Sequence, residues 1–215
     1  MFQMKSQTDK VNTDSADSPL GHPKMKPGNI RHYKNGWDLS RSLNIRLLFL
    51  ACWLFSSCRP NVGKYVKMAR EGQQRHSISP KRPVVIIDYT KPLFIKRLHV
   101  VQTTNEKILL SARVSHAWNS GMLCASRFSN EIGSLKSSRG HFRTGKTNYG
   151  RYGYSLTVDG LDMDLNNNAR RRAILFHSTK KMKTRWSAGC FATEESVNRR
   201  LIDMIKNGCL VIVIR

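Results

Sequence analysis

The sequence lacks several patterns that indicate common functions. It contains no Gly-x-x-x-x-Gly-Lys-Ser/Thr phosphate loop, no Gly-x-Ser-x-Gly elbow, and no RNA-recognition, zinc-finger or helix-turn-helix pattern. Its five cysteines form no C-x-x-C pair, and no His/Cys cluster has zinc spacing. An odd number of widely separated cysteines does not describe a disulfide framework. These absences argue against a P-loop enzyme, a serine hydrolase, a zinc module and a disulfide scaffold.

Acidic side chains are scarce. The 215 residues include 14 Asp and Glu against 37 Lys and Arg, a formal net charge of +23. Residues 1–60 hold 9 basic and 4 acidic side chains, whereas residues 61–215 hold 28 and 10, so most of the excess lies in the later part of the chain. Such a surface favours polyanions, namely nucleic acid, anionic lipid or an acidic cell-wall polymer. Without a recognition motif, no specific nucleic acid partner is expected.

Apolar runs are too short for a membrane span. The longest, Leu47–Phe55, holds about ten residues, whereas a spanning helix needs about 20. Basic residues precede it and Ser56-Ser57-Cys58 follows, which is the layout of an export signal. The ending resembles a lipobox, whose cysteine is acylated. We therefore predict a signal or lipobox-like segment at 44–58 and an exported protein of the periplasm or cell envelope, with lipid anchoring through Cys58 as an option. The alternative is a buried helix of a cytoplasmic protein.

The rest of the chain divides by composition. Residues 1–43 are polar and show no periodicity, so we expect them to be disordered or to precede the true start of the protein. Residues 59–83 are expected to form a polar linker, with a short helix from Val62 to Gln73. Residues 84–215 are expected to form one catalytic domain.

This domain has a β-rich pattern. The region from His116 to Asn148 is rich in Gly, Ser and Asn and is expected to form loops. One helix is predicted, from Thr193-Glu194-Glu195 to about Lys206, with Asn207-Gly208 as its stop signal. The predicted fold is mostly β, a sandwich or barrel with one short C-terminal helix. The expected strands are Val84–Tyr89, Phe94–Thr103, Lys107–Val114, Tyr154–Val158, Ala173–Phe176 and Cys209–Ile214.

The stretch from Ala173 to Ala192 carries the residues that suggest chemistry. An apolar strand ends at His177, a basic loop follows, and Cys190 lies just before the predicted helix. A cysteine nucleophile needs a base or a positive potential, because the thiolate is the reactive form. His177 is a candidate base, and the loop lysines with the helix N-terminus are candidates for the field. Gly189 permits a tight turn in which N–H groups face an oxyanion. A buried structural cysteine and a hydrogen-bonded histidine remain the alternative.

Two charged clusters have simpler interpretations. Asp159, Asp162 and Asp164 suggest calcium, but their spacing misses the EF-hand loop and favours a solvated turn. The run Arg170–Arg172 has the charge to bind phosphate, but a basic run before a strand is typically a solvated edge.

A series of short motifs runs in order through the loops and the His–Cys stretch. It includes Val114-Ser115-His116, Asn119-Ser120-Gly121, Phe128-Ser-Asn130, Gly133-Ser134, Thr144-Gly145, Asp159-Gly160-Leu161, Asn168-Ala169-Arg170, His177-Ser178-Thr179 and Arg185-Trp186-Ser187-Ala188-Gly189-Cys190. Taken together, these motifs resemble one branch of the bacterial murein L,D-transpeptidases, the YkuD-type catalytic domain. The similarity runs from about Val84 to Arg215.

The resemblance implies a role for each matching residue. Cys190 is the expected nucleophile and His177 the base that activates it. The backbone carbonyl of Ser178 is expected to orient the imidazole, and the N–H groups of Gly189 and Cys190 to hold the oxyanion. No metal or other cofactor is implied. The residues expected to line the donor-peptide site are His116, Ser120, Asn130, Tyr149, Arg185 and Ser187.

The implied reaction is acyl transfer on peptidoglycan stem peptides through a Cys190 thioester. An amine acceptor gives a 3–3 crosslink, or anchors a protein to the wall. Water as acceptor gives L,D-carboxypeptidase or endopeptidase activity on the same substrate, which is one alternative. A second alternative is a catalytically weak peptidoglycan-binding module, because Ala188 and Phe191 depart from the family pattern beside the nucleophile. A third is a cytoplasmic, basic nucleic-acid binder.

Overall fold

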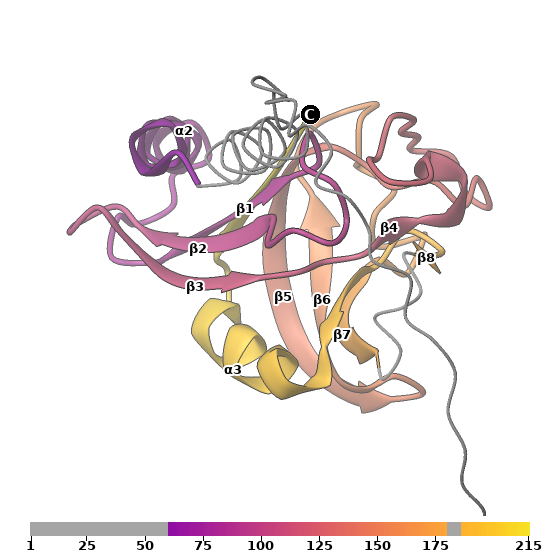
Figure 1. The fold of residues 1–215 in the computed structure, drawn as a ribbon. Helices are drawn as coiled ribbons and strands as arrows, with labels where there is room; N and C mark the ends of the chain where they lie inside the picture. Colours follow the sequence, from indigo (N-terminus) through magenta and orange to yellow (C-terminus); the bar gives the residue numbers. More distant parts are fainter. Residues whose placement is uncertain (1–59, 180–185) are drawn as a thin grey trace, which may run out of the picture. The chain divides into compact units, whose positions relative to one another are not determined.

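The computed structural model describes residues 60–179 and 186–215 and shows a mostly-β domain (Figure 1). Eight strands form one sheet in the order β3-β2-β1-β10-β5-β6-β7-β9, and β4 and β8 form a separate pair. The strands are β1 (Val84–Asp88), β2 (Leu98–Gln102), β3 (Lys107–Ala112), β4 (His116–Ala117), β5 (Gly140–Gly150), β6 (Gly153–Gly160), β7 (Leu175–Thr179), β8 (Trp186–Ser187), β9 (Phe191–Glu194) and β10 (Leu210–Ile214).

The centre of the sheet is formed by strands from the two ends of the domain. β1 pairs with β10 in parallel, and every residue of β1 is buried. Their sequences, VVIID and LVIVI, are nearly continuous apolar runs, as expected for strands covered on both faces. The second parallel pair is β7 with β9, and this pair carries the region around His177 and Cys190.

The two edges of the sheet meet. After β3, Val114 forms an antiparallel bridge with Thr193 of β9, and the Ser115 N–H donates to the Ala192 carbonyl at 2.9 Å. The sheet therefore curls toward a closed barrel around one apolar core, to which residues from both edge regions contribute. This confirms the prediction of a mostly-β sandwich or barrel.

Helix α3 (Glu195–Ile205) closes one side of this core. Leu201, Ile202 and Ile205 are fully buried in the main cluster, so the helix packs one apolar face against the strands. It ends before Asn207 and Gly208, which have φ values of 65° and 96°. Left-handed backbone at Asn and Gly is a common helix stop. The predicted helix and its stop signal are both confirmed.

A second helix, α2 (Val62–Arg75), corrects the expectation of a linker at 59–83. The side chain of Asn61 caps its first turn by accepting from the Lys64 N–H at 3.0 Å. Tyr65, Val66 and Ala69 are buried against β1 and β10 in a second apolar cluster. The expected helix in this segment is present, but it is part of the packed domain (Figure 1).

Strand β5 corrects the expectation of loops from His116 to Asn148. Its first half lies between β10 and β6, with Phe142 and Thr144 buried. The register with β6 shifts between Thr144 and Thr147, and a Cβ on Gly145 would lie 2.4 Å from the Thr157 hydroxyl. The glycine and polar residues that suggested a loop therefore belong to an irregular, closely packed strand pair.

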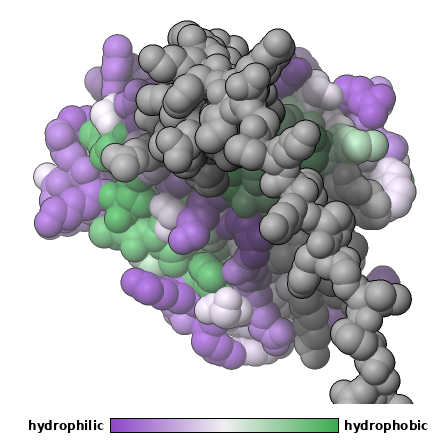
Figure 2. Space-filling model, in the orientation of Figure 1, coloured by the Kyte–Doolittle hydropathy of each residue, from purple (hydrophilic) through white to green (hydrophobic). Residues whose placement is uncertain are grey.

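Several predictions concern residues outside the described ranges. These are the disordered region at 1–43, the signal segment at 44–58 with Cys58, and Arg185. Among the described residues, no helix is long and apolar enough to cross a membrane. Figure 2 shows hydrophilic residues around much of one face, with a hydrophobic area over β2 and β3, where Leu109 is exposed.

Candidate active site

A pocket of about 510 Å³ opens where β7, β8 and β9 come together. His177 enters it from β7, and Cys190 enters it from the residue before β9. Since β7 and β9 are paired in parallel, the strand register fixes the backbones that carry the two side chains. The pocket is lined by Trp118, Leu135, Tyr152, His177, Thr179, Ser187, Ala188, Cys190 and Ala192.

The hydrogen bonding of His177 defines its tautomer. Its Nδ1 lies 2.8 Å from the Ser178 carbonyl oxygen, which can only accept, so Nδ1 carries the proton. Nε2 is left with its lone pair, as a general base requires. Burial lowers the pKa of His177, and the hydrogen bond to Ser178 offsets part of that shift. The ring is therefore neutral near pH 7, and its contact with Ser178 is the one that the resemblance implies.

The Cys190 thiol is held in its protonated form. Its Sγ donates to the Ala173 carbonyl at 3.5 Å, and the residue is 8% exposed. Ala173 has a φ of 51°, a left-handed conformation uncommon for alanine, and this conformation directs its carbonyl. Burial raises the pKa of the thiol, while a backbone hydrogen bond from Leu175 and the charge of Arg172 offset part of the rise. Cys190 and His177 thus share a pocket as a neutral pair.

The turn before Cys190 requires glycine. Gly189 has a φ of 136°, and a Cβ there would lie 2.6 Å from the Ile174 side chain. The Gly189 N–H donates to the Ser187 hydroxyl at 3.1 Å, and that hydroxyl donates to the Cys190 carbonyl at 2.8 Å. Ser187 therefore closes the turn as well as lining the pocket. Gly189 must release this hydrogen bond before its N–H can hold an oxyanion.

Arg172 supplies positive charge near Cys190, whereas the sequence predicts that this charge comes from the loop lysines and the helix N-terminus. Its guanidinium is half-buried, donates to the Ser129 and Lys136 carbonyls, and would contact a Cβ on Gly189 at 3.2 Å. Arg170 does behave as a solvated edge, because it forms an exposed ion pair with Asp159. The expected charge from the loop lysines lies outside the described residues, and α3 begins only at Glu195. Nothing in a run of three arginines marks the third as buried.

Tyr152 is a second residue that sequence reasoning missed. Its ring stacks on the His177 imidazole, with centroids 4.5 Å apart and planes at 23°. It lies in the turn joining β5 to β6, between Gly150 and Gly153. The two glycines signal that turn, but pairing with the distant β7 is what carries it to the imidazole.

The comparison with protein families decides the assignment. The family profile described as L,D-transpeptidase catalytic domain matches residues 58–214, which is most of the chain. The chain belongs to this family. Among curated proteins, none matches the sequence.

Solved structures of L,D-transpeptidases are similar to the chain at low identity. The Mycobacterium smegmatis enzyme has a TM-score of 0.41 and 12% identity, over 62% of this chain and 59% of that chain. The Stackebrandtia nassauensis enzyme has a TM-score of 0.41 and 15% identity, over 64% and 57%. For L,D-transpeptidase 1 of Mycobacterium tuberculosis the values are 0.39 and 11%, over 62% and 62%. The chain thus spans less than two thirds of each, and the family assignment rests on the profile.

Two residues of the motifs that resemble the family, His116 and Ser120, are buried and form hydrogen bonds within the fold. His116 is 0% exposed; its Nδ1 accepts from Arg97 and its Nε2 donates to the Gly121 carbonyl, each at 2.8 Å. Ser120 is also 0% exposed, and its hydroxyl accepts from the Ser137 N–H at 2.7 Å. Neither lines the Cys190 pocket. Their polar atoms hold the loop beside the pocket, and contact with the donor peptide stays a prediction for both residues.

Two further motif residues lie elsewhere. Asn130 bonds to Asn167 and Asn168 and lines a different, smaller hollow. Tyr149 is 70% exposed at the end of β5, where its ring packs on Tyr154 with centroids 5.0 Å apart. Of the six expected donor-site residues, Ser187 is the one placed at the pocket among those that the structure describes.

Proposed function

We propose that the chain is a cysteine-dependent L,D-transpeptidase acting on peptidoglycan stem peptides through a Cys190 thioester. One observation carries the proposal. In a chain of this family, Cys190 and His177 open onto one pocket, and the hydrogen bond to Ser178 leaves Nε2 of the imidazole free to accept a proton. The pocket is wide enough for a peptide segment and holds apolar side chains beside the nucleophile.

The first half of the reaction forms the thioester. As the donor peptide binds, Nε2 of His177 takes the proton from Sγ of Cys190, and the thiolate attacks the donor carbonyl. The tetrahedral oxyanion is held by the N–H groups of Gly189 and Cys190, with Gly189 exchanging its bond to Ser187 for the oxyanion. The imidazolium then returns its proton to the departing amine, so the C–N bond breaks as the thioester forms.

The second half transfers the acyl group. An amine of another stem peptide attacks the thioester, His177 takes a proton from that amine, and the proton returns to sulfur as the new amide forms. The positive charge of Arg172 lies close enough to lower the pKa of the thiol, which stabilises the thiolate as it leaves. The basic surface suits an acidic wall polymer. Arg185 remains a prediction for binding the donor peptide.

The proposal requires a location outside the cytoplasmic membrane, because that is where the crosslinked wall lies. The segment at 44–58 is the candidate export signal, and acylation of Cys58 is the candidate anchor. Mass spectrometry of the mature N-terminus tests both. Retention of residues 1–58 on protein recovered from the cell would contradict export by this segment.

The decisive experiment is intact-mass spectrometry of the 215-residue protein after exposure to a carbapenem, which acylates the nucleophile of this family. We expect one adduct on the wild type and none on Cys190→Ala. Cys124→Ala is the matched control, because Cys124 is a partly exposed free cysteine away from the pocket, and it should retain the adduct. An adduct that persists in Cys190→Ala, or its absence from folded wild type, would refute the Cys190 mechanism.

The acceptor is tested separately. A stem tetrapeptide with an amine acceptor gives a joined product in a transpeptidase, whereas a carboxypeptidase releases only the terminal residue. A weak wall-binding module is favoured by one observation, the thiol hydrogen bond to Ala173 in a pocket that raises the thiol pKa. Wall binding unchanged by Cys190→Ala, with neither product formed, would support the binding module and exclude both enzymes.

A further inference from the structure

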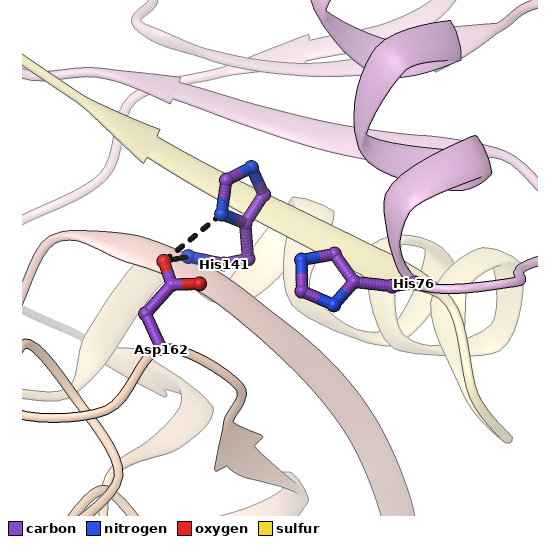
Figure 3. A group of neighbouring side chains, drawn as sticks. All are labelled: His76, His141 and Asp162. Atoms are coloured by element: carbon purple, nitrogen blue, oxygen red, sulfur yellow. Dashed lines mark hydrogen bonds and ion pairs between the residues drawn. The ribbon is translucent and has the colours of Figure 1, made fainter.

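Away from the pocket, three potential metal ligands from distant parts of the sequence point toward one another (Figure 3). His76 follows the last turn of α2, His141 lies near the start of β5, and Asp162 follows β6. One ligand atom from each lies within 4.8 Å of the other two. The cluster is at the open end of the β5–β6 hairpin, whereas Tyr152 and the pocket are at its closed end.

Close packing brings His76 to the sheet. Gly72 of α2 lies against β10 and β5, and a Cβ there would lie 2.7 Å from Leu210 and 3.6 Å from Cδ2 of His141. The His76 N–H donates to the Gly72 carbonyl at 3.1 Å, so the helix end places the imidazole directly after this contact. A larger residue at 72 would push the helix, and His76 with it, away from β5.

Asp162 is held in position by its own neighbours. Asn166 is 0% exposed; its Oδ1 accepts from the Asp162 N–H at 3.0 Å, and its Nδ2 donates to the His141 carbonyl at 2.9 Å. Oδ2 of Asp162 accepts the backbone N–H of His141 at 2.8 Å. Supporting hydrogen bonds of this kind orient ligands in metal sites.

The pair of ligand atoms from His141 and Asp162 already has nearly the required spacing. Nδ1 and Oδ2 lie 2.9 Å apart. Two ligands at about 2.0–2.1 Å from a tetrahedral zinc ion are separated by about 3.3 Å. A small movement therefore opens this hydrogen bond to admit an ion, and the imidazole proton of His141 moves from Nδ1 to Nε2 by exchange with water.

The third ligand atom has no hydrogen-bond partner. Among the described residues, Nε2 of His76 is the buried side-chain nitrogen or oxygen without one. Figure 3 shows the His76 ring presenting its outer edge to His141 and Asp162, and the two imidazole centroids are 4.9 Å apart. A buried polar atom left unpaired costs free energy, which a metal ion bound at this nitrogen would offset.

The cluster is reachable from the surface. The side chains of His141 and Asp162 each have an exposure of 19%, so an ion with its remaining water ligands has access to the two ligand atoms that they offer.

We propose that His76, His141 and Asp162 form a binding site for one Zn²⁺ ion, with water completing the coordination. Two imidazole nitrogens and one carboxylate favour zinc over Mg²⁺ and Ca²⁺, which prefer oxygen ligands. The ion fastens the end of α2 to β5 and to the loop after β6. It is a structural clip, separate from the acyl-transfer site.

The test is titration of the chelator-treated, 215-residue protein with Zn²⁺ in a calorimeter. All variants carry Cys190→Ala, so that the pocket thiol is not a competing ligand. We expect one saturable site, weakened more than tenfold by His76→Gln and by Asp162→Asn, and Mg²⁺ should not compete. The matched control is Asp159→Asn, a carboxylate in the same Asp-rich stretch that pairs with Arg170 instead, and its affinity should stay within twofold.

The shift of Tm caused by Zn²⁺ is a second measurement, which can be made on variants that are less stable than the background protein. Ligand binding to the native state raises the midpoint of thermal unfolding, so Zn²⁺ should raise Tm in the background protein and in Asp159→Asn. The rise should vanish in His76→Gln, whose substitution lies at a helix end. Equal zinc affinity and equal Tm shift in all variants, or no saturable site in the background protein, would overturn the proposal.

Discussion

His177 and His116 lie on strands that pair on either side of the turn before Cys190, and they use their nitrogens differently. His177 donates from Nδ1 to the Ser178 carbonyl, so its Nε2 at the pocket carries a lone pair and no proton. His116 uses both nitrogens, accepting from Arg97 and donating to Gly121, and is fully buried. The difference separates a histidine that can exchange a proton from one that holds a loop in place, and family-like motifs contain both.

The largest effect on chemistry is expected from His177→Asn. Loss of a positioned general base lowers the rate of a proton-transfer step by about 10²- to 10⁴-fold. Carbapenem acylation of Cys190 should therefore slow by that factor. Intact-mass time courses measure the rate, and the Tm should change little. Acylation at the wild-type rate would show that another group, or the solvent, takes the thiol proton.

The largest effect on stability is expected from His116→Ala. It removes an acceptor from the guanidinium of Arg97, which is 0% exposed, and leaves part of a buried charge unpaired. The free energy of unfolding should fall by about 3 kcal/mol, as urea titration followed by circular dichroism would measure. At temperatures where the variant is folded, the acylation rate should change much less than in His177→Asn. The reverse pattern, a large loss of acylation rate with little loss of stability, would support the prediction that His116 binds the donor peptide.

The reactivity of Cys190 should depend on pH as expected for a protonated thiol beside a neutral imidazole. An ordinary thiol has a pKa of about 8.5, and burial raises that of Cys190, so its thiolate fraction rises with pH through and beyond that value. Alkylation by iodoacetamide, followed on the Cys190 peptide, should accelerate with pH up to a midpoint above the pKa of about 8.5 of an ordinary thiol.

Arg172 sharpens this measurement. Because its charge lowers the pKa of the thiol, Arg172→Met should move the midpoint for Cys190 to higher pH, while Arg172→Lys should keep it near that of the wild type. A midpoint for Cys190 below the pKa of an ordinary thiol would show a resting thiolate–imidazolium pair instead.

The smallest effect is expected from Tyr152→Leu, which removes the ring stacked on His177. An aromatic contact of this kind contributes about 0.5–1.5 kcal/mol, so acylation should slow by about 2- to 10-fold. Since burial lowers the pKa of His177, greater exposure should raise that pKa. As the pH falls, the imidazole of the variant should therefore become protonated, and stop acting as a base, at a higher pH than in the wild type. Titration of the imidazole by NMR checks the direction. An unchanged pKa of His177 would show that groups other than Tyr152 bury the imidazole.

The sequence predicts the elements whose local signals agree with their environment. The apolar strands at Val84 and Leu210 and the helix stopped by Asn207-Gly208 are of this kind. Strand β5 is not predicted, because the Gly, Ser and Asn residues of the region from His116 to Asn148 favour loops, whereas the neighbouring strands β10 and β6 impose the pairing. Helix α2 was expected as part of a linker, since its apolar face is short and its buried partners lie far along the chain.

The candidate site was predictable in part for a related reason. Cys190, His177 and the Ser178 carbonyl come from one short stretch in which the motif and the strand register agree. The burial of Arg172 and the stacking of Tyr152 on His177 depend on tertiary packing, and the sequence around these two residues carries no pattern that predicts it. A motif holds residues that the fold needs together with residues that the reaction needs. Only the complete set of partners distinguishes His116 from His177.

The left-handed backbone at Ala173 has a consequence for the oxidation of Cys190. Its carbonyl holds the Cys190 hydrogen in a pocket that already disfavours the anion. Peroxide and other oxidants attack thiolates far faster than thiols, and the sulfinic and sulfonic products are not recovered. While the hydrogen bond to Ala173 is intact, the sulfur therefore stays in the thiol form, which oxidises slowly. On the proposed mechanism, Cys190 is open to rapid oxidation only while His177 holds its proton.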